Sequence, residues 1–348
     1  MTAPRKITEG DRSVDIAVIG GGVFGASAAL RLADAGHSVT LFEAKTLGAG
    51  ATGAAAGMLC PDVEGCSPGA SAEVHRVLKA AAAMWPKWAA RLGVPLEADG
   101  SLWLTPAVPA LGPVEDLSAD LPDLAASGLV PMGYRFPDDR RLDPAVLIGQ
   151  LRHHMAQQGV TLREHTPIEA VEATASQAQI VVYETRHRFD YVLVATGHRV
   201  PPGVRLQDGW QDQLMPIRGQ GVLMKAPAPD HILRGQGVYV CPVAAEVCYV
   251  GATMEVGVAE PVSAPEALRP LMEKAAKTLW PQLMRAAILD YKVGIRPGSK
   301  DHLPKIGPTK DPTVWAILGG HRNGILLSPW VADHLVSQMT TAEAATSA

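Results

Sequence analysis

Apolar runs and a helical period alternate along the first fifty residues of the chain. Residues 16–19 and 39–42 are largely apolar and have the length of buried strands, and residues 26–35 between them are typical of a helix that ends before Gly36. This order predicts a strand-helix-strand unit whose two strands are parallel neighbours in one sheet.

The middle of the chain continues this mixed pattern after an interruption. Residues 74–92 predict a helix interrupted at Pro86. The region that follows this helix, up to Pro137, is rich in Pro, Gly and Asp, which is typical of an insertion with short strands of its own. The helical period returns over residues 143–159. Four strands are predicted after it, at residues 160–162, 168–171, 180–183 and 188–194.

The second half of the chain predicts a different kind of sheet. Three runs alternate between apolar and polar side chains and are separated by turns, as in an antiparallel sheet: residues 219–225, 237–243 and 246–253. A helix is predicted over residues 262–283, a strand over 314–318 and a closing helix near 330–339. The pattern therefore predicts an α/β fold in which a Rossmann-like nucleotide-binding domain is interleaved with an antiparallel-sheet substrate domain.

A glycine-rich turn joins the first predicted strand to its helix. Gly20 is expected to turn the chain, Gly22 to let the backbone approach a pyrophosphate, and Gly25 to let the helix pack on the strand. Glu43, at the end of the next strand, is placed to accept hydrogen bonds from ribose hydroxyls, and its charge disfavours a 2′-phosphate. The complete unit predicts a bound dinucleotide.

Small residues fill the segment that follows Glu43. Residues 47–59 are mainly Gly, Ala and Thr, which predicts either a backbone that lies flat against a planar ligand or an alanine-rich helix in the core. Gly197, just after the strand predicted over residues 188–194, is a second position where backbone could meet the cofactor.

Composition and charge narrow the function. The 348 residues are 47% hydrophobic and 19% charged, which is ordinary for an α/β enzyme, and a net charge of −4 without a basic run argues against nucleic-acid binding. No apolar stretch reaches the length of a membrane span, and residues 1–13 are too polar for a signal peptide, so we expect a cytoplasmic protein with a small-molecule substrate. The four cysteines lack metal-ligand spacing, so we expect reduced thiols and no metal.

Further segments follow the glycine-rich turn in a fixed order along the chain: Ile217-Arg-Gly-Gln220, Tyr239-Val-Cys-Pro242, Gly251-Ala-Thr-Met254, Gly294-Ile-Arg-Pro297 and Arg322-Asn-Gly-Ile-Leu-Leu327. With these segments the chain resembles the FAD-dependent D-amino-acid oxidase superfamily, and most closely its glycine oxidase branch, which is associated with thiamine biosynthesis. The resemblance implies FAD rather than NAD, a small amino-acid substrate and O2 as the oxidant, and it suggests a homotetramer.

The resemblance also implies an order of domains. A discontinuous FAD-binding domain is expected at residues 13–80, 143–205 and 290–340. The substrate-binding domain is expected at residues 81–142 and 206–289.

Individual residues match functional positions of that family. Arg296 matches the arginine that holds the substrate carboxylate, Tyr239 the tyrosine that donates to it, and Arg322 a second arginine beside the site, and Met254 is expected to line the pocket. The implied FAD contacts are Gly20, Gly22, Val23, Phe24, Gly25, Glu43, Ala44, Thr52, Ala55, Gly57, Met58, Val171, Gly197, Asn323, Gly324 and Ile325.

Two of these FAD contacts have a more specific implied place. Val171 matches the position that meets the adenine. Residues 323–326 match a loop at the pyrimidine edge of the flavin, and the helix after it would add its N-terminal dipole. On the residue type alone, Arg296 could instead bond carbonyl groups near Pro297.

The chain departs from the family pattern at Gly53, at His198 and at Gly320-His321, which bears on the shape of the pocket and on access to the flavin. Three functions follow. The first is oxidative deamination of glycine, sarcosine or small D-amino acids by hydride transfer to flavin, with O2 reduced to H2O2. The second is a D-amino-acid or imino-acid dehydrogenase with a quinone or carrier acceptor, and the third is a flavin-binding subunit without amine chemistry.

Overall fold

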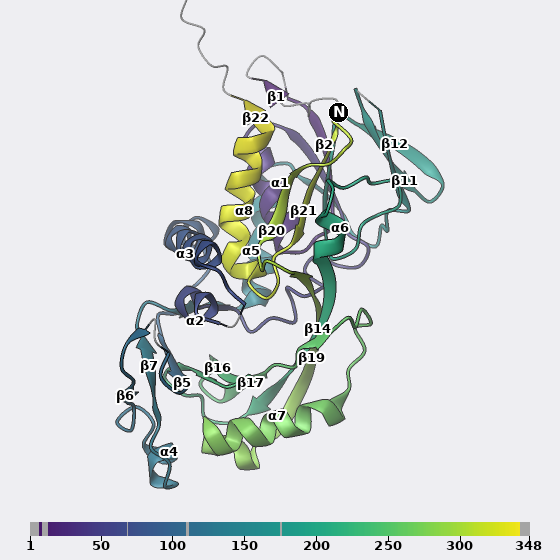
Figure 1. Cartoon of the computed structure of the whole chain (residues 1–348). Coiled ribbons are helices and arrows are strands. Elements are labelled where there is room, and N and C mark those ends of the chain that lie inside the picture. Colours follow the sequence, from purple (N-terminus) through teal and green to yellow (C-terminus); the bar gives the residue numbers. More distant parts are fainter. Residues whose placement is uncertain (1–6, 9–12, 68, 109–110, 175, 342–348) are drawn as a thin grey trace, which may run out of the picture.

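Two bodies, each built around one large sheet, make up the protein (Figure 1). The computed structural model describes residues 7–8, 13–67, 69–108, 111–174 and 176–341. Two long antiparallel strands, β14 (Leu214–Lys225) and β19 (Ala287–Ser299), lead from the upper body of Figure 1 into the lower body.

A six-stranded sheet forms the centre of the upper body. From edge to edge its strands are β20 (Pro304–Pro308), β21 (Val314–Gly319), β13 (Tyr191–Gly197), β2 (Asp15–Ile19), β3 (Ser38–Phe42) and β9 (Thr161–Arg163). All neighbours are parallel except β20, which runs antiparallel to β21. Parallel strands buried on both faces require a covering layer on each side.

Helices cover one face of this sheet, and a small sheet covers the other. Ile16 and Val18 of β2 pack into the core formed with four helices, whereas Ala17 and Ile19 pack toward the opposite layer. The helices are α1 (Val23–Asp34), α3 (Ala72–Leu92), α5 (Pro144–Gln157) and α8 (Gly324–Met339). The opposite layer is formed by β10 (Ala170–Ala173), β11 (Ala178–Val182) and β12 (Thr185–Phe189).

A nine-stranded, mainly antiparallel sheet forms the lower body. Its main path is β18 (Glu255–Val256), β14, β17 (Val247–Gly251), β16 (Val238–Ala244), β15 (Ile232–Gly235), β5 (Ser101–Leu104), β7 (Met132–Phe136) and β6 (Glu115–Asp116), and β19 pairs with β14 off this path. Helix α7 (Pro265–Thr278) and the 3-10 helix η2 (Pro281–Arg285) pack on one face. Val238 and Val240 of β16 point to that face, so Tyr239 points to the other.

The remaining elements are short. They are α2 (Pro61–Gly65), α4 (Pro122–Ala126), α6 (Trp210–Gln213), the pair β4 (Met58–Leu59) and β8 (Arg140–Arg141), and the pair β1 (Ile7–Thr8) and β22 (Thr340–Thr341). In the described ranges, no helix combines the length and the apolar character that crossing a bilayer requires.

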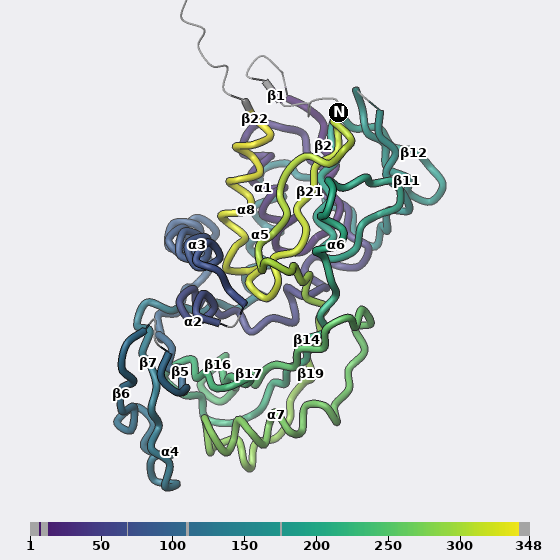
Figure 2. The backbone as a smooth tube through the Cα atoms, viewed as in Figure 1, coloured from purple at the N-terminus to yellow at the C-terminus, as the bar shows by residue number. Residues whose placement is uncertain are grey.

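The order of the chain through the two bodies explains the change in sequence pattern. Figure 2 shows purple, teal and yellow segments side by side in the upper body, whereas the lower body is blue and green. Each body is therefore assembled from segments that lie far apart in the sequence. The predicted fold class, a Rossmann-like α/β domain interleaved with an antiparallel-sheet domain, is confirmed.

Three predicted helices differ from the observed ones. Helix α3 is not interrupted at Pro86 but continues through it to Leu92. Helix α8 begins at Gly324, six residues before the predicted start near Trp330, and it contains Pro329. The helix predicted over residues 262–283 divides into α7 and η2.

Candidate functional site

A cavity of about 1540 Å³ lies between the two bodies. The upper body contributes the glycine-rich turn after β2, the end of β3 and the start of α8, and the lower body contributes β16, β17 and β19. Single-ligand pockets usually measure about 300–1,000 Å³. The cavity therefore has room for a dinucleotide together with a second small molecule.

The glycines of the turn have the geometry that a phosphate-binding turn requires. A Cβ atom at Gly20 (φ 107°) would lie 2.5 Å from the Ala195 carbonyl oxygen, and one at Gly25 would clash with the carbonyl of Gly20. A Cβ atom at Gly22 would meet no atom closer than the Thr52 hydroxyl oxygen, at 3.8 Å. The first and third glycines thus permit close packing, and Gly22 leaves open space at the N-terminus of α1.

Glu43 directly follows β3 beside this turn and lines the cavity. One carboxylate oxygen accepts a hydrogen bond from the Gly21 N–H at 2.7 Å, and the other accepts one from the Lys45 N–H at 2.8 Å. These two bonds hold the carboxylate at the edge where a ribose would lie, next to Ala44, which also lines the cavity.

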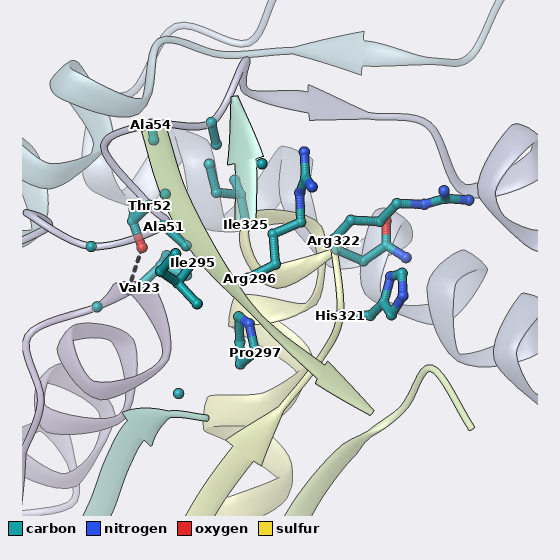
Figure 3. Close-up of a pocket in the computed structure, with 18 of the residues that line it drawn as sticks. Val23, Ala51, Thr52, Ala54, Ile295, Arg296, Pro297, His321, Arg322 and Ile325 are labelled. Carbon is teal, nitrogen blue, oxygen red and sulfur yellow. Dashed lines mark hydrogen bonds between the residues drawn. The ribbon is translucent and has the colours of Figure 1, made fainter. Parts of the chain in front are cut away.

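The small-residue segment is a series of turns and not an alanine-rich helix. The Thr52 hydroxyl oxygen accepts a hydrogen bond from the Val23 N–H at 3.0 Å, which joins the segment to the start of α1 (Figure 3). Gly57 (φ 78°) packs against the Leu142 carbonyl too closely for any side chain. Ala55, Gly57 and Met58 line the cavity. This geometry fits the first of the two predictions, in which the backbone of the segment lies along a ligand.

The start of α8 closes the same cavity from the C-terminal side. Asn323 is the N-cap residue, and Asn323, Gly324 and Ile325 line the cavity. Because α8 begins at Gly324, its free N–H groups and the positive end of its dipole face the cavity directly. Val23, Phe24 and Gly197 also line it.

The match of Val171 to the position that meets the adenine needs correction, because Val171 does not line this cavity. Its side chain is buried in the core beside β11, and its N–H donates to the Pro202 carbonyl at 2.9 Å. Ile168, three residues earlier and ahead of β10, lines the cavity together with Thr166 and Pro167. Ile168, and not Val171, is therefore the residue in a position to contact the adenine of a dinucleotide in this cavity.

Arg296 lies on β19 with its guanidinium group directly over Gly219 of β14. Its Nη1 donates to the Thr253 carbonyl at 2.9 Å, and among the described residues it has no carboxylate partner. Figure 3 shows the side chain projecting from its strand among the residues that line the cavity. A guanidinium without an acidic partner is suited to bind a carboxylate in two parallel hydrogen bonds.

Tyr239 and Tyr249 stack beside this arginine, with ring centroids 6.0 Å apart and an interplanar angle of 15°. Burial raises the pKa of Tyr239 to about 12, although Arg296 acts in the opposite direction. The Tyr239 hydroxyl therefore stays protonated at neutral pH and can donate a hydrogen bond. The Tyr249 hydroxyl donates to the Ala54 carbonyl at 2.8 Å, which joins the lower sheet to the small-residue segment.

Arg322 forms a buried ion-pair cluster with Glu64 and Arg234. The Glu64 carboxylate accepts from the Nε of Arg322 and from an Nη of Arg234, the latter at 2.6 Å. Burial disfavours the charged form of Glu64, but Arg234 and Arg322 outweigh this effect and lower its pKa to about 2. Glu64 thus stays ionised and fixes both arginines at the cavity wall.

His321 stacks on His302, with ring centroids 4.4 Å apart, beside Arg322 (Figure 3). Burial and the neighbouring His302 lower the pKa of His321 to about 4, so it is neutral at pH 7. The departure from the family pattern at this position therefore adds no charge to the cavity. His198, another of the departures, also lines the cavity, and burial lowers its pKa too.

The structure gathers most of the residues that the sequence marked. Arg296, Tyr239, Arg322 and Met254 line the cavity, with Met254 48% exposed at its rim. Glu64, Arg234, Tyr249 and Ile168 were missed, because no short motif marks them. The four cysteines are free, and within the described ranges no three His, Cys, Asp or Glu side chains are grouped to hold a metal ion.

Comparison with known proteins connects this geometry to a family. The family described as "FAD dependent oxidoreductase" (DAO) matches residues 15–338. Glycine oxidase of Geobacillus kaustophilus is 28% identical over 361 residues, which cover 94% of this chain and 94% of that protein. Its crystal structure has a TM-score of 0.82 at 25% identity, covering 94% of this chain and 95% of that one.

A second relative is longer. The "Bifunctional protein ThiO/ThiG" of Nostoc sp. is 27% identical over 374 residues, which cover 93% of this chain and 53% of that protein. The chain thus spans about half the length of this relative.

Proposed function

Because this chain belongs to the FAD-dependent oxidoreductase family, we propose that it catalyses the oxidative deamination of small amino acids, with O2 as the final electron acceptor. Glycine, sarcosine and small D-amino acids are the proposed substrates. The products are H2O2 and an imine, which is then hydrolysed by water. Two of the relatives described above carry the name glycine oxidase or ThiO, which supports this choice of substrate.

The cavity fits FAD at several independent places. Gly22 leaves space for a pyrophosphate at the start of α1, and the Glu43 carboxylate is positioned for ribose hydroxyls. The small-residue segment around Thr52 and the N-terminus of α8 at Gly324 would lie along the isoalloxazine ring system. When bound, FAD would supply the hydride acceptor for the reaction.

The observation that carries the proposal is the Arg296 guanidinium, which faces the cavity without a carboxylate partner among the described residues. It would hold the substrate carboxylate in a fixed orientation, and the protonated Tyr239 hydroxyl would donate to the same group. Holding a substrate in one reactive orientation is a large part of catalysis in such a site.

Glu64, the carboxylate that pairs with two arginines of the cavity, is not a strong base. Glu64 has a pKa near 2, which makes it too weak a base to take a proton from the substrate ammonium group. The substrate would therefore bind with its amine already neutral. The role of the protein is then to bind, orient and shield the substrate.

Anaerobic mixing of the purified FAD-loaded protein with glycine, sarcosine, D-alanine and D-proline tests the proposal. We expect one of them to bleach the flavin absorbance, and we expect air to restore it with release of peroxide. Bleaching that persists in air would replace the oxidase by a dehydrogenase with another acceptor. No bleaching by any of the four would contradict the proposed substrate class.

Replacement of Arg296 by Ala tests the assigned role of this residue. We expect substrate binding to weaken by about 2–5 kcal/mol, because the substrate carboxylate would be left unpaired in the cavity. Arg296→Lys keeps the charge but loses the paired hydrogen bonds of a guanidinium group. Its substrate affinity should lie between those of the wild type and Arg296→Ala. An unchanged kcat/KM in Arg296→Ala would exclude the assignment.

A further inference from the structure

Arg234 is a further guanidinium group of the cavity, in addition to Arg296, Arg322 and Arg199. It lies on β15 directly opposite Tyr239 of β16, and residues paired in this way project from the same face of a sheet. Both therefore face the cavity, which both line. The Arg234 side chain is only 13% exposed.

The hydrogen-bonding capacity of this arginine is largely unused. A guanidinium group has five N–H donors. Among the described residues, the only hydrogen bonds from Arg234 and from Arg322 are one each to Glu64. The remaining donors of this pair are not enclosed by protein, and both residues line the cavity, so these donors mark a place for an anionic ligand group.

The charges around the substrate end lead to the same conclusion. Among the described residues, Arg234 and Arg322 share one carboxylate, Glu64, and Arg296 has none. The other lining carboxylate, Glu43, is bound to the Gly21 N–H at the glycine-rich turn. Asp139, a further carboxyl group on which the charge of Arg234 acts, does not line the cavity and instead accepts a hydrogen bond from the Ser101 hydroxyl at 2.5 Å. A single substrate carboxylate on Arg296 leaves the Arg234–Arg322 pair with a positive charge that has no partner in the cavity.

The two cationic positions lie on one sheet face with two strands between them. The Arg296 guanidinium lies over β14, and Arg234 starts from β15, with β17 and β16 in between. Three strand spacings correspond to about 14 Å between backbones, and both long side chains shorten that distance. The stacked ring of Tyr239 lies between them.

We propose that the substrate is an amino acid with a second carboxylate, whose α-carboxylate binds Arg296 and whose second carboxylate binds the Arg234–Arg322 pair. This inference rests on the proposed function, because it specifies the substrate class of the same site.

Binding of unreactive analogues to the FAD-loaded protein tests the inference without turnover. Diglycolate has two carboxylates and no amine, and methoxyacetate is a matched compound with one carboxylate. Both are titrated while the flavin absorbance and the heat of binding are measured. We expect diglycolate to bind about 10- to 100-fold more tightly, the range for charge-assisted hydrogen bonds. Arg234→Gln should remove most of this preference, and Arg234→Lys should keep part of it.

Arg186→Gln is the matched control, since Arg186 pairs with Glu172 on the exposed β10–β12 sheet. It should keep the full preference. Equal affinities of the wild-type protein for diglycolate and methoxyacetate would overturn the inference. An equal loss of affinity for both compounds in Arg234→Gln would also overturn it, because Arg234 would then have a purely structural role or a role toward the flavin.

Turnover separates this inference from the proposed function. Iminodiacetate should bleach the flavin at lower concentration than its monoamide, which has the same shape and one charge fewer. Bleaching by glycine or sarcosine without a preference for iminodiacetate would refute only the second carboxylate site. A diglycolate preference without any bleaching would refute only the proposed chemistry.

Discussion

Gly219→Ala should impair substrate binding while leaving the fold intact. Gly219 lies on β14 beneath the Arg296 guanidinium, and a Cβ atom there would be 2.2 Å from its Cζ atom. Ordinary contact between carbon atoms is about 3.5–4.0 Å, so the guanidinium would have to move by more than about 1 Å. The obstacle is the end of a flexible side chain, so the backbone can stay in place.

The size of the effect follows from that displacement. A misplacement of about 1 Å in a positioning group can lower the rate by about 100-fold, which corresponds to roughly 2.7 kcal/mol. Stability should change little, because Gly219 has no left-handed φ angle and Gly→Ala at a compatible position gains about 0.4–1 kcal/mol through the unfolded state. We therefore expect a large loss of kcat/KM together with a nearly unchanged thermal midpoint.

Anaerobic flavin reduction as a function of substrate concentration measures the kinetic effect of the substitution. Circular dichroism on heating measures the thermal midpoint. Gly149→Ala is the matched control, because Gly149 lies in α5 and a Cβ atom there would have no neighbour within 4 Å. It should keep wild-type kinetics. Wild-type kinetics in Gly219→Ala would refute the placement of Arg296, and a collapse of the thermal midpoint would refute the reasoning that only the side chain yields.

Two further substitutions test the cofactor side and the electrostatics. Gly25→Ala should lose FAD, because its Cβ atom would lie 1.9 Å from the Gly20 carbonyl oxygen, a backbone atom that cannot move aside; a fluorescence titration of the apoprotein should show at least about a 100-fold weaker affinity, about 2.7 kcal/mol. Asp139→Asn should stabilise the protein above pH 7. Burial raises the Asp139 pKa to about 6, above the unfolded value, so the stability that its neutral form contributes is complete below about pH 4 and is lost as pH rises through 6. The neutral Asn avoids that loss, which amounts to at most about 3 kcal/mol. Denaturant unfolding at pH 5 and pH 8 should show a larger gain at pH 8, and an equal change at both values would argue against a shifted pKa.

Local patterns predicted the cofactor side well, because the glycine-rich turn and its flanking elements are contiguous in sequence. The ion-pair cluster could not be predicted in the same way. Glu64 and Arg322 are 258 residues apart, and Glu64 and Arg234 are 170 apart. Nothing in the neighbourhood of Glu64 distinguishes it from an ordinary surface carboxylate, so only the folded arrangement brings the three charges together.

Helix α3 shows how tertiary packing outweighs a local signal. Pro86 removes one helical hydrogen bond, which favours a break on local grounds. Trp85 and Trp88 on either side of it are nevertheless buried, and the Trp85 Nε1 donates to the Leu326 carbonyl of α8 at 2.9 Å. These contacts hold the helix together on both sides of the proline.

The Val171 assignment failed for a related reason. The pattern over residues 168–171 predicts a strand, but the observed β10 starts at Ala170, so Ile168 lies ahead of it and lines the cavity. An apolar run shows that a segment is buried but not whether its first residues leave the sheet. The sequence pattern therefore identifies the segment but not which of its residues meets the ligand.

The substrate wall depends on a second set of glycines, separate from those of the glycine-rich turn. Gly219, Gly221 and Gly251 lie beneath Arg296, Tyr249 and Tyr239 respectively, and a Cβ atom at any of them would meet the overlying group at 2.2–2.4 Å. Large side chains can lie flat on this sheet only because the neighbouring strand carries no side chain there. Side chains alternate between the faces of a strand, so a register slip of one residue would turn Tyr239 toward α7 and bring Val240 to the cavity side. The positions of the carboxylate-binding groups are therefore set by the register of β14, β16 and β17 as much as by the arginine and the tyrosine themselves.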